Sequence, residues 1–265
     1  MTKDRKAEVY EMSGSMEGRR VLVVGASAGI GRAIATHAVR EGAATVLSAR
    51  RADALRAAVG EAGGGVAIAG DVCDADDCRR VVDETCRALG GLDLLVSAVG
   101  VAPMQRVLDT TPEQWRRVFE TNTIGVQQMI AAAVPALGET GTVAVLSSET
   151  VGRPRAGLVA YTSSKAALEE SLRGWRAEHG GMRFTCITVG ATVPTEFGTE
   201  FDPDVMASVF EDWTRQGLWQ AEFMDTDEVG RVIVRSLAVA LACPSVGIEQ
   251  LTLRSPSRVV DAPIV

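Results

Sequence analysis

Short apolar runs alternate with helix-like segments along almost the whole chain, and this alternation constrains the fold more than any other feature. The strand-like runs are RRVLVVG (19–25), ATVLSAR (44–50), GVAIAGDV (65–72), LDLLVSAVG (92–100), TVAVLSS (142–148), MRFTCITVG (182–190) and GIEQLTL (247–253). Helices are predicted over 29–42, 52–62, 75–89, 112–137, 158–179 and 226–242. Near-continuously apolar strands separated by helices are typical of a parallel sheet covered on both faces. We therefore expect an α/β fold, a single doubly wound domain with a mainly parallel seven-stranded sheet and helices on both faces.

Length and composition favour one enzyme-sized domain. The chain has 265 residues, of which 46% are hydrophobic and 23% charged, enough to bury a large core. We expect this domain over 18–265. Residues 1–17 are predicted to be a flexible tail, since charges stand where a signal peptide needs an apolar run.

Charge and cysteine content argue against several functional classes. The net charge is −7 and the arginines are scattered, which disfavours nucleic-acid and membrane partners. The five cysteines form no C-x-x-C pair and only two histidines are present, so no metal site or disulfide framework is predicted. No run of about 18 apolar residues occurs. A reducing compartment and a cytoplasmic location are expected.

A glycine-rich turn follows the first predicted strand. VGASAGIGRA places Gly25, Gly29 and Gly31 between strand and helix, where missing β-carbons allow a tight turn and close approach of a pyrophosphate to the helix N-terminus. The spacing is G-x-x-x-G-x-G, and glycines also serve plain structural turns. Its place after the first strand of an alternating chain favours dinucleotide binding.

The ends of the second and third strands carry candidate cofactor contacts. SARR places Arg50 and Arg51 where an acid would favour NAD, so the pair favours NADP(H). Either arginine could instead be a solvated charge that begins the next helix, an alternative we favour more for Arg51 than for Arg50. Asp71 and Val72 are placed to hold the adenine, and Asp71 could also cap the following helix.

Tyrosine and lysine are both rare here, and in the body of the chain they occur together. Of 27 basic residues only Lys3, Lys6 and Lys165 are lysines, and Tyr161 is the one tyrosine besides Tyr10. Four residues apart on a helix, Tyr161 and Lys165 project from one face. A nearby ammonium favours phenolate, which would suit acid–base chemistry. A surface lysine beside a half-buried tyrosine is the alternative.

In combination these motifs resemble the short-chain dehydrogenase/reductase family. The matching segments are GASAGIG at 25–31, DV at 71–72, the asparagine of ETNTIG, SS at 147–148 and Y-x-x-x-K at 161–165, in the family's order and spacing over roughly 18–255. The resemblance implies four catalytic residues, which are Asn122, Ser148, Tyr161 and Lys165. Taken singly, Ser148 could be a turn residue and Asn122 a polar group satisfied by backbone within its helix.

The resemblance also implies a set of cofactor-binding positions. They are Gly25, Ser27, Ala28, Gly29, Ile30, Gly31, Arg50, Arg51, Asp71, Val72, Ser97, Ala98, Gly100, Tyr161, Lys165, Gly190 and Thr192. Two motifs depart from the family pattern. Its N-N-A-G appears here as Ser97 to Gly100, and its P-G appears as Val189 and Gly190.

The implied activity is hydride exchange between NADP(H) and a carbonyl or secondary alcohol. Ser148 would bind the carbonyl oxygen, Tyr161 would protonate it, and Lys165 would lower the tyrosine pKa and hold the ribose, with Asn122 in a proton relay. A non-catalytic, redox-responsive NADP(H)-binding protein is the alternative. The family also implies a homo-oligomer, a tetramer or dimer, built on helices 112–137 and 158–179. Candidate outward residues are Val118, Ile130, Leu168 and Leu172, for which burial against the sheet is the alternative.

The resemblance implies that the variable segment after the sixth strand closes the substrate pocket. We place this substrate lid at 191–225, and it is rich in aromatic and acidic residues. Its aromatic residues are Phe197, Phe201, Phe210, Trp213, Trp219 and Phe223, and Met206 and Met224 add apolar volume. Its acids are Glu196, Glu200, Asp202, Asp204, Glu211, Asp212, Glu222 and Asp225, against Arg215 alone. These features favour a neutral, largely apolar substrate over a thioester. The aromatic residues could equally just pack the segment onto the domain. An anionic substrate would direct attention to Arg153 and Arg155.

Overall fold

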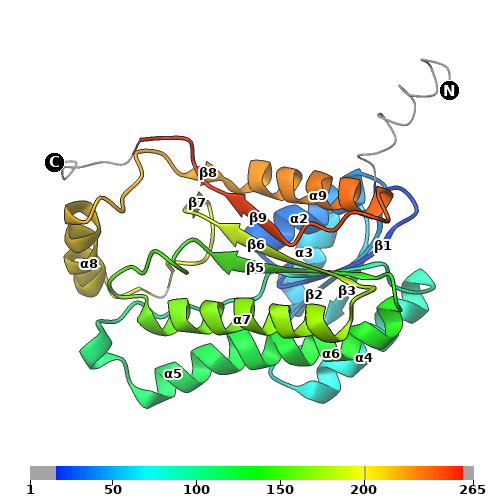
Figure 1. The fold of residues 1–265 in the computed structure, drawn as a ribbon, viewed down its shortest axis with the longest axis horizontal. Coiled ribbons are helices and arrows are strands. Elements are labelled where there is room, and N and C mark those ends of the chain that lie inside the picture. The colour runs from blue at the N-terminus through cyan, green and yellow to red at the C-terminus, as the bar shows by residue number, and fades with distance from the viewer. Residues whose placement is uncertain (1–15, 200, 259–265) are drawn as a thin grey trace.

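The computed structural model describes residues 16–199 and 201–258, and it is built around one parallel sheet (Figure 1). The strand order is β3-β2-β1-β4-β5-β6-β9, and every neighbouring pair is parallel. The strands are β1 (Arg20–Val24), β2 (Ala44–Ala49), β3 (Val66–Ala69), β4 (Leu94–Ser97), β5 (Thr142–Ser148), β6 (Arg183–Val189) and β9 (Gln250–Leu253). This topology confirms the predicted doubly wound sheet. The strand order reverses between β1 and β4, which is where such folds bind ligands.

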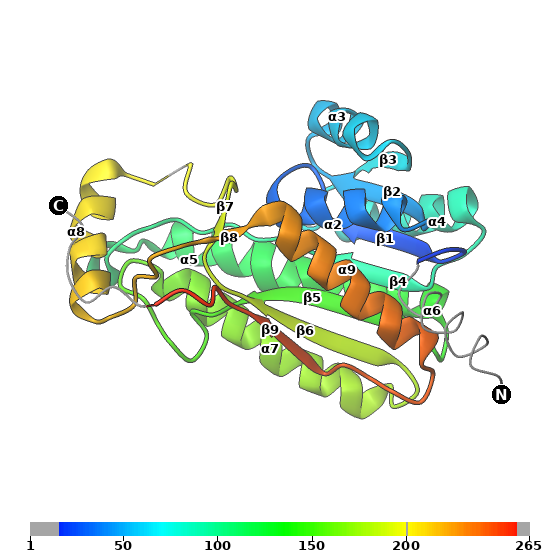
Figure 2. The same cartoon turned by 90° about the horizontal axis from the view of Figure 1, so that it is seen from above.

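Helices cover both faces of the sheet (Figure 2). One layer contains α2 (Gly29–Arg40), α3 (Ala52–Ala62) and α9 (Thr226–Ala242), and the other contains α4 (Ala75–Leu89), α6 (Gly125–Leu137) and α7 (Val159–Glu178), with α5 (Pro112–Phe119) leading into α6. Two apolar clusters fill the spaces between sheet and layers. Met16 is 1% exposed and belongs to the first cluster, so the ordered domain begins before residue 18; the rest of the predicted tail, 1–15, lies outside the described residues.

The predicted helix over 112–137 is interrupted. A π-helix at Glu120–Ile124 separates α5 from α6. The side chain of Asn122 is completely buried there and is held by the loop after β4 and by α7: its amide donates to the Val101 carbonyl oxygen at 2.9 Å and to Ser164 Oγ at 3.0 Å, and its oxygen accepts from the Val101 N–H at 2.8 Å. Single-turn π-helices of this kind are frequent at functional sites.

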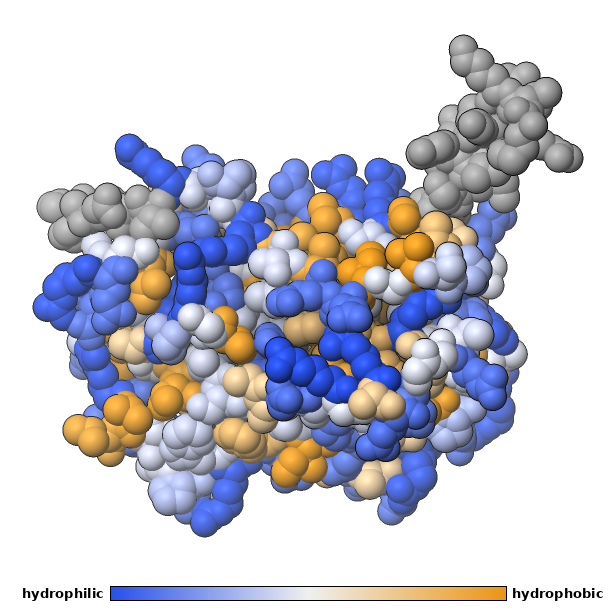
Figure 3. Space-filling model, viewed as in Figure 1, coloured by the Kyte–Doolittle hydropathy of each residue, from blue (hydrophilic) through white to orange (hydrophobic). Residues whose placement is uncertain are grey.

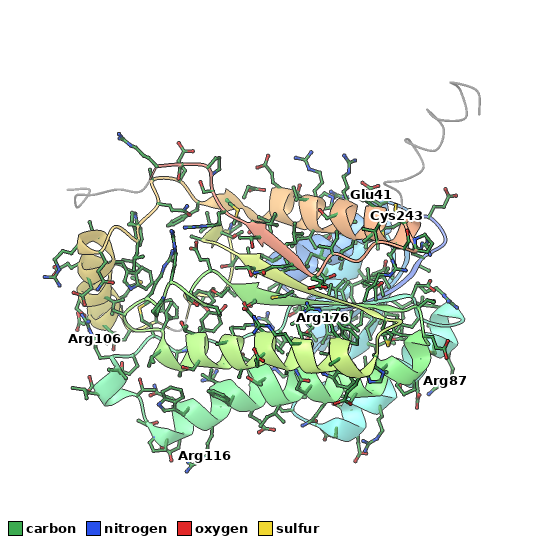
Figure 4. All side chains as sticks on the ribbon, in the orientation of Figure 1. Glu41, Arg87, Arg106, Arg116, Arg176 and Cys243 are labelled. Atoms are coloured by element: carbon green, nitrogen blue, oxygen red, sulfur yellow. The ribbon has the colours of Figure 1, made fainter. Side chains whose placement is uncertain are left out.

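Beyond the carboxyl ends of the strands stands a segment that the strand–helix pattern did not predict. It contains α8 (Pro203–Arg215) and a two-stranded ribbon of β7 (Thr192–Val193) and β8 (Met224–Asp225). In Figure 2, α8 lies apart from the sheet. It has its own small core of Met104, Leu158, Val209 and Trp213. Arg106, labelled in Figure 4, ties the loop before α5 to α8 by pairing with Asp212 and by donating to Ser208 Oγ at 3.0 Å.

The residues expected to face outward for oligomerisation are buried within the chain. Val118, Ile130, Leu168 and Leu172 are each at most 1% exposed, so the expectation that they face outward was wrong. Ile130, Leu168 and Leu172 belong to the apolar cluster between the sheet and the α4, α6 and α7 layer, as the alternative of burial against the sheet had it. The mostly polar face in Figure 3 is broken by apolar side chains over α9, where Val232 and Val239 are 43% and 47% exposed. No helix in the described part of the chain is long and apolar enough to cross a membrane.

Candidate active site

A cavity of about 860 Å³ lies along the carboxyl ends of the central strands and extends under the α8 segment. Its wall includes the glycine turn, Arg50, Arg51, Asp71 and Val72 at one end and Ser148, Tyr161 and Lys165 further along. Ala98, Gly100, Gly190 and Thr192 also line it. Two predicted residues do not. Ser97 is buried within β4, and Asn122 lies behind the wall with its side chain engaged by the Val101 backbone and by Ser164.

The glycine turn needs its glycines for two different reasons. Gly25 has φ +82° and Gly29 has φ +52°, conformations that residues with a β-carbon rarely adopt. Gly31 is required for packing, because a β-carbon there would lie 2.2 Å from the main-chain oxygen of Gly25. Ala28 begins α2 without a side-chain cap, and the first turn has no acidic residue. The first turn of α2 therefore presents N–H groups without a side-chain cap on the cavity wall, an arrangement that favours anions at helix N-termini.

The two arginines after β2 differ in their surroundings. Arg51 makes a two-pronged ion pair with Glu196, at 3.1 Å from Nη1 and 2.6 Å from Nη2, and donates from Nη2 to Ser27 Oγ at 3.2 Å. Its guanidinium therefore lies against Ser27 of the glycine turn. Arg51 is also the N-cap residue of α3 and its side chain is 55% exposed, so it does begin the next helix, as the alternative had it, while keeping these partners. Arg50 is exposed beside Asp71 and lines the same cavity. Guanidinium groups here suit an anionic phosphate ester.

Asp71 does not cap the helix that follows it. Asp74 does so, accepting from Asp76 N at 2.8 Å and Asp77 N at 3.2 Å. Asp71 instead accepts from the Cys73 N–H at 3.0 Å, because an aspartate readily bonds the backbone two residues further on. This turn leaves Asp71 and Val72 on the cavity wall. The capping expectation for Asp71 was therefore wrong.

Tyr161 and Ser148 form the polar centre of the cavity. Ser148 Oγ accepts from the Thr150 N–H at 3.2 Å and from Thr150 Oγ1 at 3.0 Å. With its oxygen used as a double acceptor, Ser148 is left with its own O–H to donate. Burial raises the pKa of Tyr161 to about 12, and the hydrogen bond with Ser148 acts in the opposite direction. Thr150 is a functional neighbour that sequence reasoning missed, although its place two residues after Ser148 is typical of such a turn.

Lys165 is buried one helical turn beyond Tyr161. Its Nζ donates to the carbonyl oxygens of Val99 at 2.9 Å and Leu146 at 2.8 Å, which fixes it between β4 and β5. Burial lowers the pKa of Lys165 to about 8. The interaction that lowers the pKa of Tyr161 against the effect of burial is the hydrogen bond with Ser148, not the charge of Lys165. Two of the three ammonium donors are used, and one remains.

The α8 segment closes the far part of the cavity. Phe197 packs edge-on against Tyr161 with ring centroids 5.2 Å apart, and the wall continues through aromatic residues of the same segment. They are Phe201, Phe210, Trp213, Trp219 and Phe223. Trp213 also belongs to the small core, so these residues both pack the segment and line the cavity. Arg155 lies in this wall, whereas Arg153 is exposed outside it.

Several lid acids have structural partners. Asp202 caps α8 and Asp225 caps α9. Asp212 pairs with Arg106 and Arg215, and Glu196 pairs with Arg51. Glu200 lies outside the described residues. Within residues 16–199 and 201–258, no three histidine, cysteine, aspartate or glutamate side chains gather as metal ligands would.

The sheet order, the glycine turn and the cavity at the switch point define a Rossmann-type α/β protein. A family model described as short chain dehydrogenase matches residues 19–208. The chain therefore belongs to the short-chain dehydrogenase/reductase family, whose members are oxidoreductases.

Individual relatives agree with this family. A glucose 1-dehydrogenase of Gluconobacter oxydans is 32% identical over 203 residues, 72% of this chain and 76% of that protein. A dehydrogenase/reductase of Sinorhizobium meliloti superposes with a TM-score of 0.77 at 28% identity, covering 92% of this chain and 97% of the other. A short chain dehydrogenase of Burkholderia cenocepacia in complex with NADP gives 0.76 at 28% identity, covering 90% and 97%.

Some relatives are much longer than the matching region. A glycine betaine reductase of Emericella nidulans is 31% identical over 84% of this chain, but the match is 18% of that protein. The matches to an oxidoreductase of Methylorubrum extorquens and an 11-beta-hydroxysteroid dehydrogenase of Sesamum indicum cover 64% and 53% of those proteins. The chain thus spans less than two thirds of these relatives.

Proposed function

We propose that this protein is an NADP(H)-dependent oxidoreductase that interconverts a neutral, largely apolar ketone and its secondary alcohol. The observation that carries the proposal is that one cavity is lined by an uncapped glycine turn and two arginines at one end and by Ser148, Tyr161 and Lys165 at the other. Anion binding and proton donation thus occur within reach of a single extended ligand.

The residues of the cavity fit a phosphorylated dinucleotide. Gly25 and Gly31 let backbone approach where a β-carbon would collide, and α2 offers its free N–H groups to the pyrophosphate. Arg50 and Arg51 would bind the 2′-phosphate that distinguishes NADP from NAD. The cofactor, when bound, would supply or accept the hydride. The NADP in the Burkholderia cenocepacia structure supports this assignment.

The polar side chains at the centre of the cavity would transfer the proton. The Tyr161 phenol is protonated at neutral pH and could donate its proton to an oxygen that gains charge. Burial raises its pKa to about 12, so this donation depends on groups that favour phenolate, of which the hydrogen bond with Ser148 is one. Ser148, with its oxygen occupied by Thr150, would donate its hydrogen to the same substrate oxygen. Lys165, held by two carbonyl groups, would offer its remaining N–H to the ribose and, once close to Tyr161, stabilise phenolate.

Asn122 would position the loop after β4 rather than contact the substrate. Its side chain clamps both the N–H and the carbonyl of Val101, which line the loop beside Lys165. Both of its amide hydrogens are used, so a relay water would need the remaining lone pair or the main-chain carbonyl. Cytoplasmic location, assembly into a homodimer or homotetramer, and the extent of the lid over 191–225 remain predictions.

The test is oxidation of NADPH and NADH by the purified protein with a panel of ketones and diketones, including an acetoacetyl thioester. We expect turnover with NADPH and a higher kcat/KM for bulky neutral ketones than for the thioester. Preference for the thioester would refute the substrate class, and preference for NADH would refute the cofactor. Tight NADPH binding without turnover of any substrate would favour the non-catalytic alternative.

A further inference from the structure

Three polar side chains interrupt the aromatic wall of the substrate part of the cavity. Glu149, Arg155 and Gln220 all line it, among the phenylalanine and tryptophan rings of the α8 segment. Glu149 and Gln220 are each 6% exposed, so neither is a surface residue. Burying such groups in an apolar wall is costly unless their hydrogen-bonding capacity is met.

Arg155 is fixed from three sides. Its Nη2 donates to Glu149 Oε1 and, at 3.3 Å, to the Leu218 carbonyl oxygen, and its guanidinium carbon lies 5.3 Å from the centre of the Trp213 ring. Glu149 also pairs with Arg254 at 3.1 Å, so two guanidinium groups balance its charge. Among the described residues, nothing accepts a hydrogen bond from the buried Nε of Arg155.

Gln220, by contrast, has a buried hydrogen-bond acceptor without a donor in the described part of the chain. Its Nε2 donates to the Ser255 carbonyl oxygen at 3.2 Å. The opposite amide orientation would bring two oxygens together, so this contact fixes which end is which. The buried Oε1 then has no donor among the described residues. Arg155 and Gln220 are linked through Leu218, whose carbonyl binds the first and which stands two residues before the second.

We propose, resting on the function proposed above, that Arg155 and Gln220 form a subsite for a second hydroxyl group of the substrate. A hydroxyl can accept from Arg155 Nε and donate to Gln220 Oε1 at the same time. Neither atom is exposed to the cavity as the side chains stand, so binding requires side-chain rotations of the kind common at binding sites to bring both to the ligand. The substrate class is an aromatic or alicyclic ketone that also carries a hydroxyl.

Other groups fit this place less well. A hydrogen or methyl group leaves both polar atoms without partners. A carboxylate could accept from Arg155 Nε but cannot donate to Gln220 Oε1, which would stay without a partner. A site built to bond a hydroxyl discriminates against the analogue that lacks it, because its own buried groups then stay unpaired.

The test compares three matched ring ketones that carry hydroxyl, hydrogen or carboxylate at the same position. We expect the ratio of kcat/KM for the hydroxyl over the hydrogen compound to be about 10 to 100. Gln220→Met keeps the length of the side chain and removes Oε1, so the ratio should fall toward 1. Gln216→Met, at an exposed position of the same segment outside the cavity, should leave the ratio unchanged.

A ratio of 1 in the unmodified protein, preference for the carboxylate, or a ratio that survives Gln220→Met would each overturn the subsite. Arg155→Lys keeps a cation beside Glu149 but removes Nε, and it serves if Gln220→Met does not fold. Calorimetric Kd values for the same ligands on the NADPH-loaded protein give the ratio without turnover. Failure to reduce any ketone would thus refute the proposed reaction, while the Kd ratio would still decide the subsite.

Discussion

Removing the carboxylate of Glu196 should strengthen NADPH binding. Glu196 occupies the guanidinium of Arg51 with both oxygens, and the next residue, Phe197, packs on Tyr161. Thr195 lies over the glycine turn, 3.6 Å from where a β-carbon of Gly29 would stand. These three consecutive lid residues therefore cover the sites proposed for the 2′-phosphate, the pyrophosphate and the reacting carbon. The 2′-phosphate must displace Glu196 in order to pair with Arg51.

The expected change in NADPH affinity follows from how exposed the Arg51–Glu196 ion pair is. The side chains of Arg51 and Glu196 are 55% and 54% exposed, so solvent screens the pair. Exposed ion pairs contribute about 0.2 to 1 kcal/mol, and the two-pronged geometry favours the upper end of that range. Since 1.4 kcal/mol is tenfold, we expect Glu196→Gln to lower the Kd of NADPH by about two- to fivefold. NADH lacks the phosphate, and its Kd should not change.

The assay is titration of nucleotide fluorescence at low and high salt. The gain should shrink in about 1 M salt, where the screening length is only about 3 Å. Glu211→Gln is the matched control, because it removes the same charge from an exposed position on α8 outside the cavity. An unchanged or higher Kd for NADPH in Glu196→Gln, or an equal gain for NADH, would refute the reasoning.

Three further predictions concern the turn and the polar centre. Tyr161→Phe should reduce kcat by at least about 100-fold while the Kd of NADPH, measured by the same titration, stays within about twofold; an active variant would place the proton donor elsewhere. Gly31→Ala should abolish measurable NADPH binding, because the added β-carbon would lie 2.2 Å from the main-chain oxygen of Gly25. Gly174→Ala, where nothing lies within 4 Å of the added β-carbon, should keep NADPH binding and raise the free energy of unfolding by about 0.5 to 1 kcal/mol. Equal NADPH affinity in the two variants would contradict the packing explanation. Burial lowers the pKa of Lys165 from 10.5 to about 8, so between these values the unfolded chain binds more protons and unfolding free energy should rise with pH. Urea titrations at pH 7.5 and 9.5 should show this rise reduced in Lys165→Met, and an identical pH dependence in both proteins would count against a buried, perturbed amine.

The fold could be predicted where local signals agree with tertiary structure. Helix α4 has the predicted bounds and ends before Gly90, which adopts the left-handed conformation with φ 75°, a stop signal that is legible in the sequence. The π-helix at Glu120–Ile124 has no such signal, because what accompanies it is the contact of Asn122 with distant Val101. Helix α8 was not predicted either, since its buried face packs against residues far away in the chain, such as Met104.

The candidate site could be predicted where spacing dictates geometry. The residues of the glycine turn and the Tyr161–Lys165 pair lie on one cavity wall, as strand ends and a four-residue helical spacing require. The sequence does not show which of several neighbouring residues takes a given role. Asp71 and Asp74 are both plausible caps, and only the backbone path decides between them. The ion-pair partner of Arg51 is Glu196, 145 residues away, so no local pattern reveals it.

The small core under α8 is separate from the two large apolar clusters that flank the sheet. Among the described residues, its buried members are only Met104, Leu158, Val209 and Trp213, with partly buried apolar residues packed around them. A unit with so little buried apolar surface can open at a free energy well below that of global unfolding. Amide exchange in α8 should therefore be faster than in β5. Substitutions in this minor core would change how often the cavity opens, and hence turnover, without altering any group that handles the proton or the cofactor.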